Sequence, residues 1–173
     1  MIRCGDGLNS RLQLARNQYL KMLKILKDAV RRPDLFYWFG AIERSQLESW
    51  VRSSGLLVPS DLFEFWSQTG GGDLFESDTI FRPTSIPSSM PFFVSGDDLI
   101  AANEQRKKDG MPKSYLAFHD GAFLSAVRRS DRALVTLNER YEEIAEYSSL
   151  DEWYLRALRA DLAARYGLHT SAD

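Results

Sequence analysis

Few side chains of this sequence combine the types and the spacing that catalysis or metal binding requires. The two histidines, His119 and His169, stand far apart along the chain, and the single cysteine is Cys4. A structural zinc site needs clustered cysteines and histidines, so the sequence argues against one. His119 precedes Asp120 and could pair with it as a base and its orienting carboxylate. Neighbours on a strand point to opposite faces, however, and a tight turn is the expected place for this pair.

Signals for nucleophilic and phosphate chemistry are equally weak. The Gly-x-Ser-x-Gly elbow of serine hydrolases is absent. Residues 70–72 are consecutive glycines, but they lack the Gly-Lys-Ser/Thr of a phosphate-binding loop. The pairs Asp97-Asp98 and Glu142-Glu143 could ligate a hard cation, although helix capping and a solvated strand edge account for them. We therefore expect no catalytic residue, metal or cofactor. An enzyme whose carboxylates meet only in the folded chain is an alternative.

Composition predicts one globular domain. The chain has 173 residues, of which 44% are hydrophobic and 12% aromatic, enough to form a core. No apolar run approaches the roughly 18 residues that span a bilayer, and the N-terminus lacks the apolar region of a secretory signal. One cysteine cannot form an internal disulfide, which fits a reducing compartment. We expect a cytoplasmic protein with no membrane contact.

Charge is unevenly distributed along the chain. Residues 1–32 hold eight Lys/Arg and two acids, whereas residues 60–98 hold seven acids and one arginine. Residues 139–152 hold six acids and one arginine. Such acidic segments could steer the protein to a basic partner, although ordinary surface charge is the alternative. The candidate partner-binding residues are Asp73, Glu76, Asp78, Asp97, Asp98, Glu139, Glu142, Glu143 and Glu146.

The acidic balance also bears on nucleic acids. The pI near 5.8 and the two acidic segments oppose direct nucleic-acid binding, which favours basic domains. A protein with a basic surface is the kind of partner that such acidic segments would fit.

The N-terminal region has apolar residues at helical spacing and a basic remaining face. This pattern predicts an amphipathic helix over residues 10–31, with Val30 in the apolar stripe and Pro33 marking the end. We expect it to pack on the domain, with membrane or partner contact as alternatives. The aromatic residues of 34–39 are expected in the core or as a clasp between this helix and the domain.

The remaining pattern predicts an α+β fold. Helices are expected at 41–53, at 60–68, from Asp97 or Asp98 to about Lys108, and from the capping box Ser149-x-x-Glu152 onward. Short strands are expected at 79–82, 91–94, 114–119, 122–128, 133–138 and 142–147. Turns at Asp120-Gly121 and Ser130-Asp131 predict antiparallel hairpins. Helices that flank clustered strands favour an antiparallel sheet packed with N- and C-terminal helices.

The most specific local pattern lies in residues 57–72. Pro59 suits a first helical turn, and Asp61 places negative charge at the positive end of that helix. The following side chains at helical spacing form one apolar face, comprising Leu62, Phe65 and Trp66. Glycines then allow a sharp turn.

These residues resemble the signature of the SUKH superfamily, which includes SMI/KNR-type cell-wall regulators and many bacterial toxin-immunity proteins. The matching residues are Ile42-Glu43, Pro59, Asp61, Leu62, Phe65, Trp66, Gly71, Gly72 and Ile80-Phe81, followed by 115–121 with Phe118, Asp120 and Gly121. Val58 and His119 depart from the usual leucine and glycine. The resemblance implies a SUKH-like domain over 39–166, preceded by a helical extension at 1–38 and followed by a frayed tail at 167–173.

The resemblance also implies a function. Members of the superfamily mostly bind partners, so we expect a non-enzymatic protein-binding domain. Its most concrete form is an immunity protein that neutralises a cognate toxin by stoichiometric binding. The alternative is a regulatory or scaffold adaptor that resembles the cell-wall regulators.

Overall fold

The computed structural model describes residues 22–83 and 98–168 of the chain. These residues form one antiparallel sheet with the spatial order β1-β2-β3-β4-β5-β6-β7, so each strand pairs with its neighbours in sequence. The strands are β1 (Phe36–Trp38), β2 (Gly72–Leu74), β3 (Asp78–Ile80), β4 (Tyr115–Asp120), β5 (Leu124–Arg128), β6 (Leu134–Leu137) and β7 (Glu143–Tyr147). Together with the helices, this sheet confirms the predicted α+β class.

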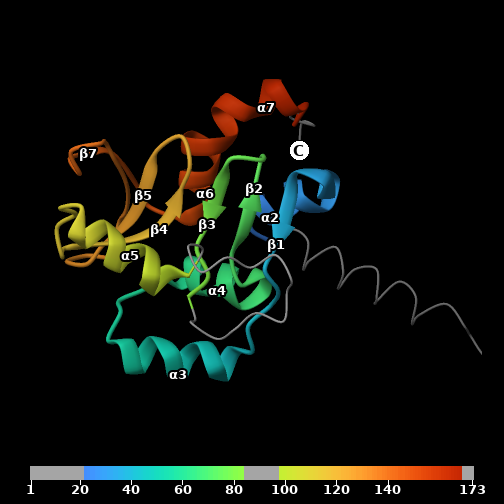
Figure 1. Ribbon diagram of the computed structural model, residues 1–173. Coiled ribbons are helices and arrows are strands. Elements are labelled where there is room, and N and C mark those ends of the chain that lie inside the picture. Colours follow the sequence, from blue (N-terminus) through green and yellow to red (C-terminus); the bar gives the residue numbers. More distant parts are fainter. Residues whose placement is uncertain (1–21, 84–97, 169–173) are drawn as a thin grey trace, which may run out of the picture.

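Helices cover the sheet on several sides (Figure 1). They are α2 (Lys24–Arg31), the 3-10 turn η1 (Pro33–Leu35), α3 (Arg44–Ser54), α4 (Ser60–Thr69), α5 (Leu99–Lys108), α6 (Leu150–Trp153), the π-helical turn η3 (Tyr154–Arg159) and α7 (Ala160–Tyr166). Helix α5 packs against β4, and α6 packs against β6 and β7. The strands β4 to β7 thus lie between α5 and α6.

The described part of the predicted N-terminal helix is α2. It packs on the same chain, because Ile25 is fully buried and Asp28 accepts hydrogen bonds from the Tyr154 hydroxyl (2.9 Å) and Arg159 Nε (2.6 Å) of η3. Val30 is 64% exposed and therefore does not belong to the buried stripe, contrary to expectation. Residues 10–21 of the predicted helix lie outside the described residues.

The aromatic segment after α2 forms an edge strand that sequence reasoning missed. Phe36 is buried, and β1 pairs with β2 in the register Phe36↔Leu74 to Trp38↔Gly72. This pairing joins residues 36–38 to the sheet, at the place where the sequence suggested the end of an N-terminal extension. A strand of three residues is too short for its alternation to be recognised in the sequence.

Helix α4 carries the apolar face predicted for it. Leu62, Phe65 and Trp66 are fully buried, and Trp66 Nε1 donates a hydrogen bond to the Phe81 carbonyl (3.0 Å). The helix ends at Gly70, whose left-handed conformation (φ 68°) favours glycine. Gly71 also has a positive φ of 87°, and β2 begins at Gly72.

Asp61 links two helix starts. Its carboxylate accepts hydrogen bonds from the backbone N–H of Leu62 (2.9 Å) and of Leu150, the first residue of α6. The acidic residue predicted to stabilise the start of α4 therefore also caps α6. The Ser149 hydroxyl completes the second start by accepting from Glu152 N–H (3.1 Å), as its capping box predicted.

The later elements follow the predicted order. Strands β4 to β7 form successive antiparallel hairpins. Asp98 is the N-cap of α5, and its carboxylate accepts from Ile100 N–H (2.9 Å) and Ala101 N–H (3.0 Å). The predicted strand at 79–82 is shorter, because Arg82 leaves β3 and makes an isolated parallel bridge to Asp98. The predicted strand at 91–94 lies outside the described residues.

Candidate protein interface

One end of the sheet carries a hollow of about 540 Å³. Its walls are the β4–β5 turn, the β6–β7 turn and β7, which contribute Phe123, Glu139, Tyr141 and Ile144. Ile144 is 62% exposed, an unusual position for a large aliphatic side chain. The hollow therefore combines apolar walls with an acidic residue on the turn.

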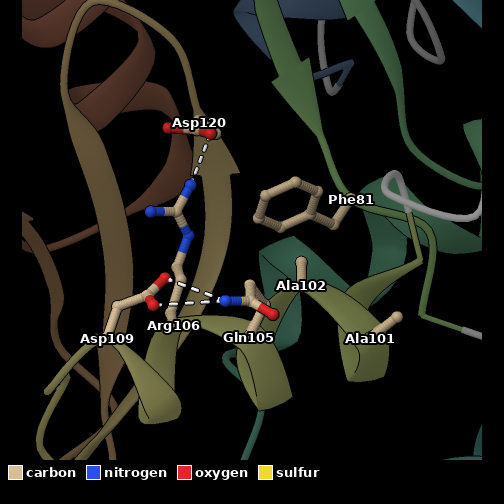
Figure 2. Close-up of a pocket in the computed structure, with 7 residues that line it drawn as sticks. All are labelled: Phe81, Ala101, Ala102, Gln105, Arg106, Asp109 and Asp120. Atoms are coloured by element: carbon tan, nitrogen blue, oxygen red, sulfur yellow. Dashed lines mark hydrogen bonds and ion pairs between the residues drawn. The ribbon is translucent and has the colours of Figure 1, made fainter.

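A second hollow of about 400 Å³ adjoins the first along α5. Figure 2 shows Ala101 and Ala102 on its α5 wall, the Phe81 ring across from Arg106, and the Arg106 guanidinium reaching Asp120. The ion pair between Arg106 and Asp120 lines both hollows. Together the two hollows make a groove from α5 to the β6–β7 turn, which we call the α5–β7 groove.

The β6–β7 turn is held by one side chain. Asn138 Oδ1 accepts hydrogen bonds from the backbone N–H of Arg140 (2.9 Å) and Glu142 (3.0 Å). Tyr141 takes the left-handed conformation (φ 61°), which costs a non-glycine residue roughly 1 kcal/mol. The contacts of Asn138 support this conformation, and they position Tyr141 at the groove.

The glutamates of β7 are organised by Arg128 of β5. Arg128 forms ion pairs with Glu143 (2.6 Å), Glu146 (2.8 Å) and Asp131 (2.7 Å), and the Tyr115 hydroxyl donates to Glu143 (2.9 Å). Hydrogen bonds to Asp131 and Glu146 raise the pKa of Arg128 above its usual value. Burial and the Glu143 carboxylate raise the pKa of Tyr115. The acidic side chains along β7 are thus fixed in place and remain exposed, except that Glu143 is partly covered by these contacts.

The structure gathers only part of the predicted partner-binding set at this groove. Glu139 lines the first hollow, and Glu142, Glu143 and Glu146 follow it along the β6–β7 turn and β7 without lining the hollow. Glu76 is exposed in the β2–β3 turn, and Asp73 of β2 accepts a hydrogen bond from Thr79 Oγ1 (2.7 Å). Asp97 lies outside the described residues.

Asp78 and Asp98 are buried and do not contribute to a surface. The Asp98 carboxylate caps α5, and Asp78 contacts the imidazole of His119. The sequence alone predicts exposure for an acidic residue, because charges are rarely buried without a partner. In both cases the partner comes from another part of the chain and was invisible in the local sequence.

His119 lies in β4 and not in the tight turn that was expected. It is fully buried, with Nε2 3.1 Å from Asp78 Oδ1 and Nδ1 3.3 Å from Ser125 Oγ. Trp153 Nε1 donates to the same serine oxygen (2.9 Å). A shift in the β4–β5 pairing between Ala117 and His119 reorients this part of β4, and the rings of both Phe118 and His119 contact Trp153.

This network has the residue types of a catalytic triad but the environment of a core. Ser125 is fully buried, and its hydroxyl is engaged by both Trp153 and His119. Burial raises the pKa of Asp78, but hydrogen bonds from His119 and Ser77 outweigh it and leave the pKa below its usual value. The ionised carboxylate therefore accepts from His119 Nε2–H, and Nδ1 shares a hydrogen bond with the serine hydroxyl. The arrangement cross-links β3, β4, β5 and α6.

Gly121 is required beside this network. A Cβ atom at this position would lie 2.0 Å from Asp78 Oδ1. The glycine of the predicted Asp120-Gly121 turn is thus needed for the close approach of Asp78.

The described residues contain neither a metal-binding cluster nor a helix that could span a membrane. No group of three or more His, Cys, Asp or Glu side chains within residues 22–83 and 98–168 could hold a metal ion. In the same part of the chain, every helix is too short or too polar to cross a bilayer.

The chain fits no protein-family model, and no curated protein matches it at a significant level. The resemblance to the SUKH superfamily rests on the motif residues described above and stays a prediction.

Sequence reasoning missed the apolar half of the candidate interface. Ile144, Tyr141 and Phe123 line the hollow, and none of them was selected as a binding residue. The one available signal was Ile144 among glutamates on an expected strand. The exposure of Ile144 could not be predicted from this signal, because the sequence does not show that β7 is an edge strand of the sheet.

Proposed function

We propose that this chain is a non-enzymatic protein-binding domain, most concretely an immunity protein that neutralises a cognate toxin by stoichiometric binding. The observation that carries the proposal is a hollow at the edge of the sheet lined by Glu139, Tyr141 and Ile144, with Glu142, Glu143 and Glu146 on the adjoining turn and strand. A protein partner with a basic surface fits this combination. A nuclease toxin is one such partner, because an enzyme that binds phosphate backbones carries a basic surface.

The two parts of the interface would act differently in binding. The exposed glutamates would speed association with a basic partner, since complementary charge steers the encounter. Ile144 and Tyr141 would lengthen the life of the complex, since buried apolar and aromatic anchors supply most of the energy of protein interfaces. Inhibition would follow from occlusion of the partner's substrate-binding surface.

The buried Asp78–His119–Ser125 network favours binding over hydrolysis. A serine nucleophile must reach its substrate, whereas Ser125 is fully buried and held by Trp153. We therefore assign the network to the stability of the fold.

The test is a pull-down with the tagged full-length protein from the organism that encodes it, with bound chains identified by mass spectrometry. We expect a single toxin domain held one-to-one. Recovery of signalling or envelope-synthesis proteins would favour the regulatory adaptor. If no stable partner is recovered, the proposal of a protein-binding domain is contradicted.

A further inference from the structure

The strand β7 lies at an edge of the sheet that the described residues form. It pairs with β6 and, among the strands formed by the described residues, with no other. Along an edge strand, alternate residues direct their backbone N–H and C=O groups away from the sheet. The edge of β7 that points away from β6 therefore carries backbone N–H and C=O groups with which another strand could pair.

The regular part of β7 is long enough to pair. Ala145, Glu146 and Tyr147 pair with Thr136, Val135 and Leu134 without interruption, and the register shifts next to Ile144. The strands β1, β2 and β3 of this sheet are each three residues long, and each pairs with its neighbours. A strand that paired with β7 over three residues would therefore be as long as strands already present in this sheet.

The charges on β7 select the kind of strand that could add. Glu143 and Glu146 lie on the strand itself, and Glu142 directly precedes it. A second copy of the chain would bring the same glutamates to the edge, and like charges on adjacent strands are destabilising. A segment rich in lysine or arginine would instead meet opposite charge. The glutamates on β7 therefore disfavour pairing between two copies of the chain and favour pairing with a basic strand.

The groove offers a place for an apolar side chain of the same segment. The exposed Ile144 forms part of the 540 Å³ hollow beside β7, together with Tyr141 and Phe123. Because strand side chains alternate between faces, a segment that alternates basic and apolar residues presents both kinds of group.

We propose that an extended basic segment of the protein partner adds to β7 as a further strand of the sheet. Its lysine or arginine side chains contact Glu143 and Glu146, and an apolar side chain enters the hollow beside Ile144. This inference rests on the proposed function and specifies how the partner is held.

The first experiment uses a synthetic peptide that alternates lysine and valine, added to the full-length protein. Amide chemical shifts and hydrogen exchange of Ala145 to Tyr147 report on pairing. We expect shift changes and slowed exchange at these residues, and no such effects from a peptide with glutamate in place of lysine. Equal effects from both peptides, or effects only at other strands, would overturn the inference.

A second experiment separates backbone pairing from side-chain contact. Two peptides of the same sequence carry N-methyl groups on alternate residues, one on each edge of the extended chain. Pairing uses one edge only, so one peptide should bind about tenfold or more weakly than the parent while the other binds about equally. Equal binding of both peptides, or loss of binding by both, would overturn the proposed strand addition.

Variants connect the peptide to β7. Glu146→Lys should weaken binding of the lysine peptide about tenfold, whereas Glu48→Lys on α3 makes the same charge change on an exposed residue and should not. Equal effects of the two changes would contradict the assignment. The outcome is separable from the proposed function. A one-to-one partner that is insensitive to Glu146→Lys leaves that function standing and refutes only the strand addition.

Discussion

At the scale of single residues, the most demanding feature is the carboxylate of Asp78 in the core. Burial disfavours its charged form, and the hydrogen bond to His119 (3.1 Å) compensates. The imidazole in turn shares a hydrogen bond with Ser125, whose oxygen is fixed by Trp153. Each polar atom of this network depends on a neighbour from another element, so the loss of one member leaves the others buried without a partner.

Replacement of Asp78 by alanine should therefore lower the free energy of unfolding by about 3 kcal/mol, since it leaves a buried imidazole without its acceptor. Urea denaturation of the variant and the wild type measures the difference. A cost below about 0.5 kcal/mol would show that the network does not stabilise the fold.

The same pair predicts a pH dependence with a definite sign. The pKa of Asp78 is lower in the folded protein than its ordinary value near 4. Its contribution is thus fully present above that ordinary pKa, and it is lost as the pH falls through the folded pKa. The stability difference between wild type and Asp78→Ala should shrink below about pH 4. A difference that stays constant over this range would contradict the lowered pKa.

At the scale of elements, the docking of α2 depends on polar contacts with the C-terminal helix. Asp28 is buried and accepts from Tyr154 of η3 and from Arg159, whose guanidinium also donates to the Leu168 carbonyl (2.8 Å). Burial and the Asp28 carboxylate raise the pKa of the Tyr154 hydroxyl, so it stays protonated and donates. These contacts join α2 to η3.

Tyr154→Phe removes one donor and leaves the ring in place. We expect a loss of about 1 kcal/mol in the free energy of unfolding, with faster amide exchange in α2. Tyr37→Phe is the control, because the Tyr37 side chain on β1 is exposed. Similar effects of the two changes would argue against the role given to Asp28.

The β6–β7 turn offers a second test at this scale. Asn138→Ala removes both hydrogen bonds to the turn backbone and should cost about 1–2 kcal/mol of stability. It should also shorten the life of a partner complex, because Tyr141 loses its fixed position at the groove. If the dissociation rate is unchanged, Tyr141 does not act as an anchor.

The elements that could be predicted from the sequence are those with a local signal. Helix α4 has its apolar face at helical spacing, and α6 has the capping box at Ser149. The hairpins of β4 to β7 follow from turn residues between apolar runs. Strands β1 and β2 have three residues each and lack such a signal, because only their partners make them strands. For the same reason, the sequence predicted the acidic residues of the candidate site but not the apolar ones. Acidic residues can be recognised singly in the sequence, whereas the hollow needs the β4–β5 turn, the β6–β7 turn and Arg106 of α5 to meet in the fold.

At the scale of the whole molecule, charge and shape coincide at one edge of the sheet. The groove lies between α5 and the β6–β7 turn, and β7 provides both Ile144 and the glutamates. The opposite end of the sheet has α2 packed near β1 and the C-terminal helix. This asymmetry makes the β7 edge the surface from which we expect the protein to bind its partner.

The measurement that tests this claim most directly is the association rate with the protein recovered in the pull-down, at several salt concentrations. Changing Glu142, Glu143 and Glu146 together to lysine should slow association at least about tenfold at low salt, and the difference should shrink as salt rises. The control changes the exposed Glu48, Glu76 and Asp161 to lysine, which alters the net charge equally on other elements. Association that is slowed only by the β7 changes agrees with the account. Unchanged rates, or equal slowing by both variants, would contradict an interface at β7.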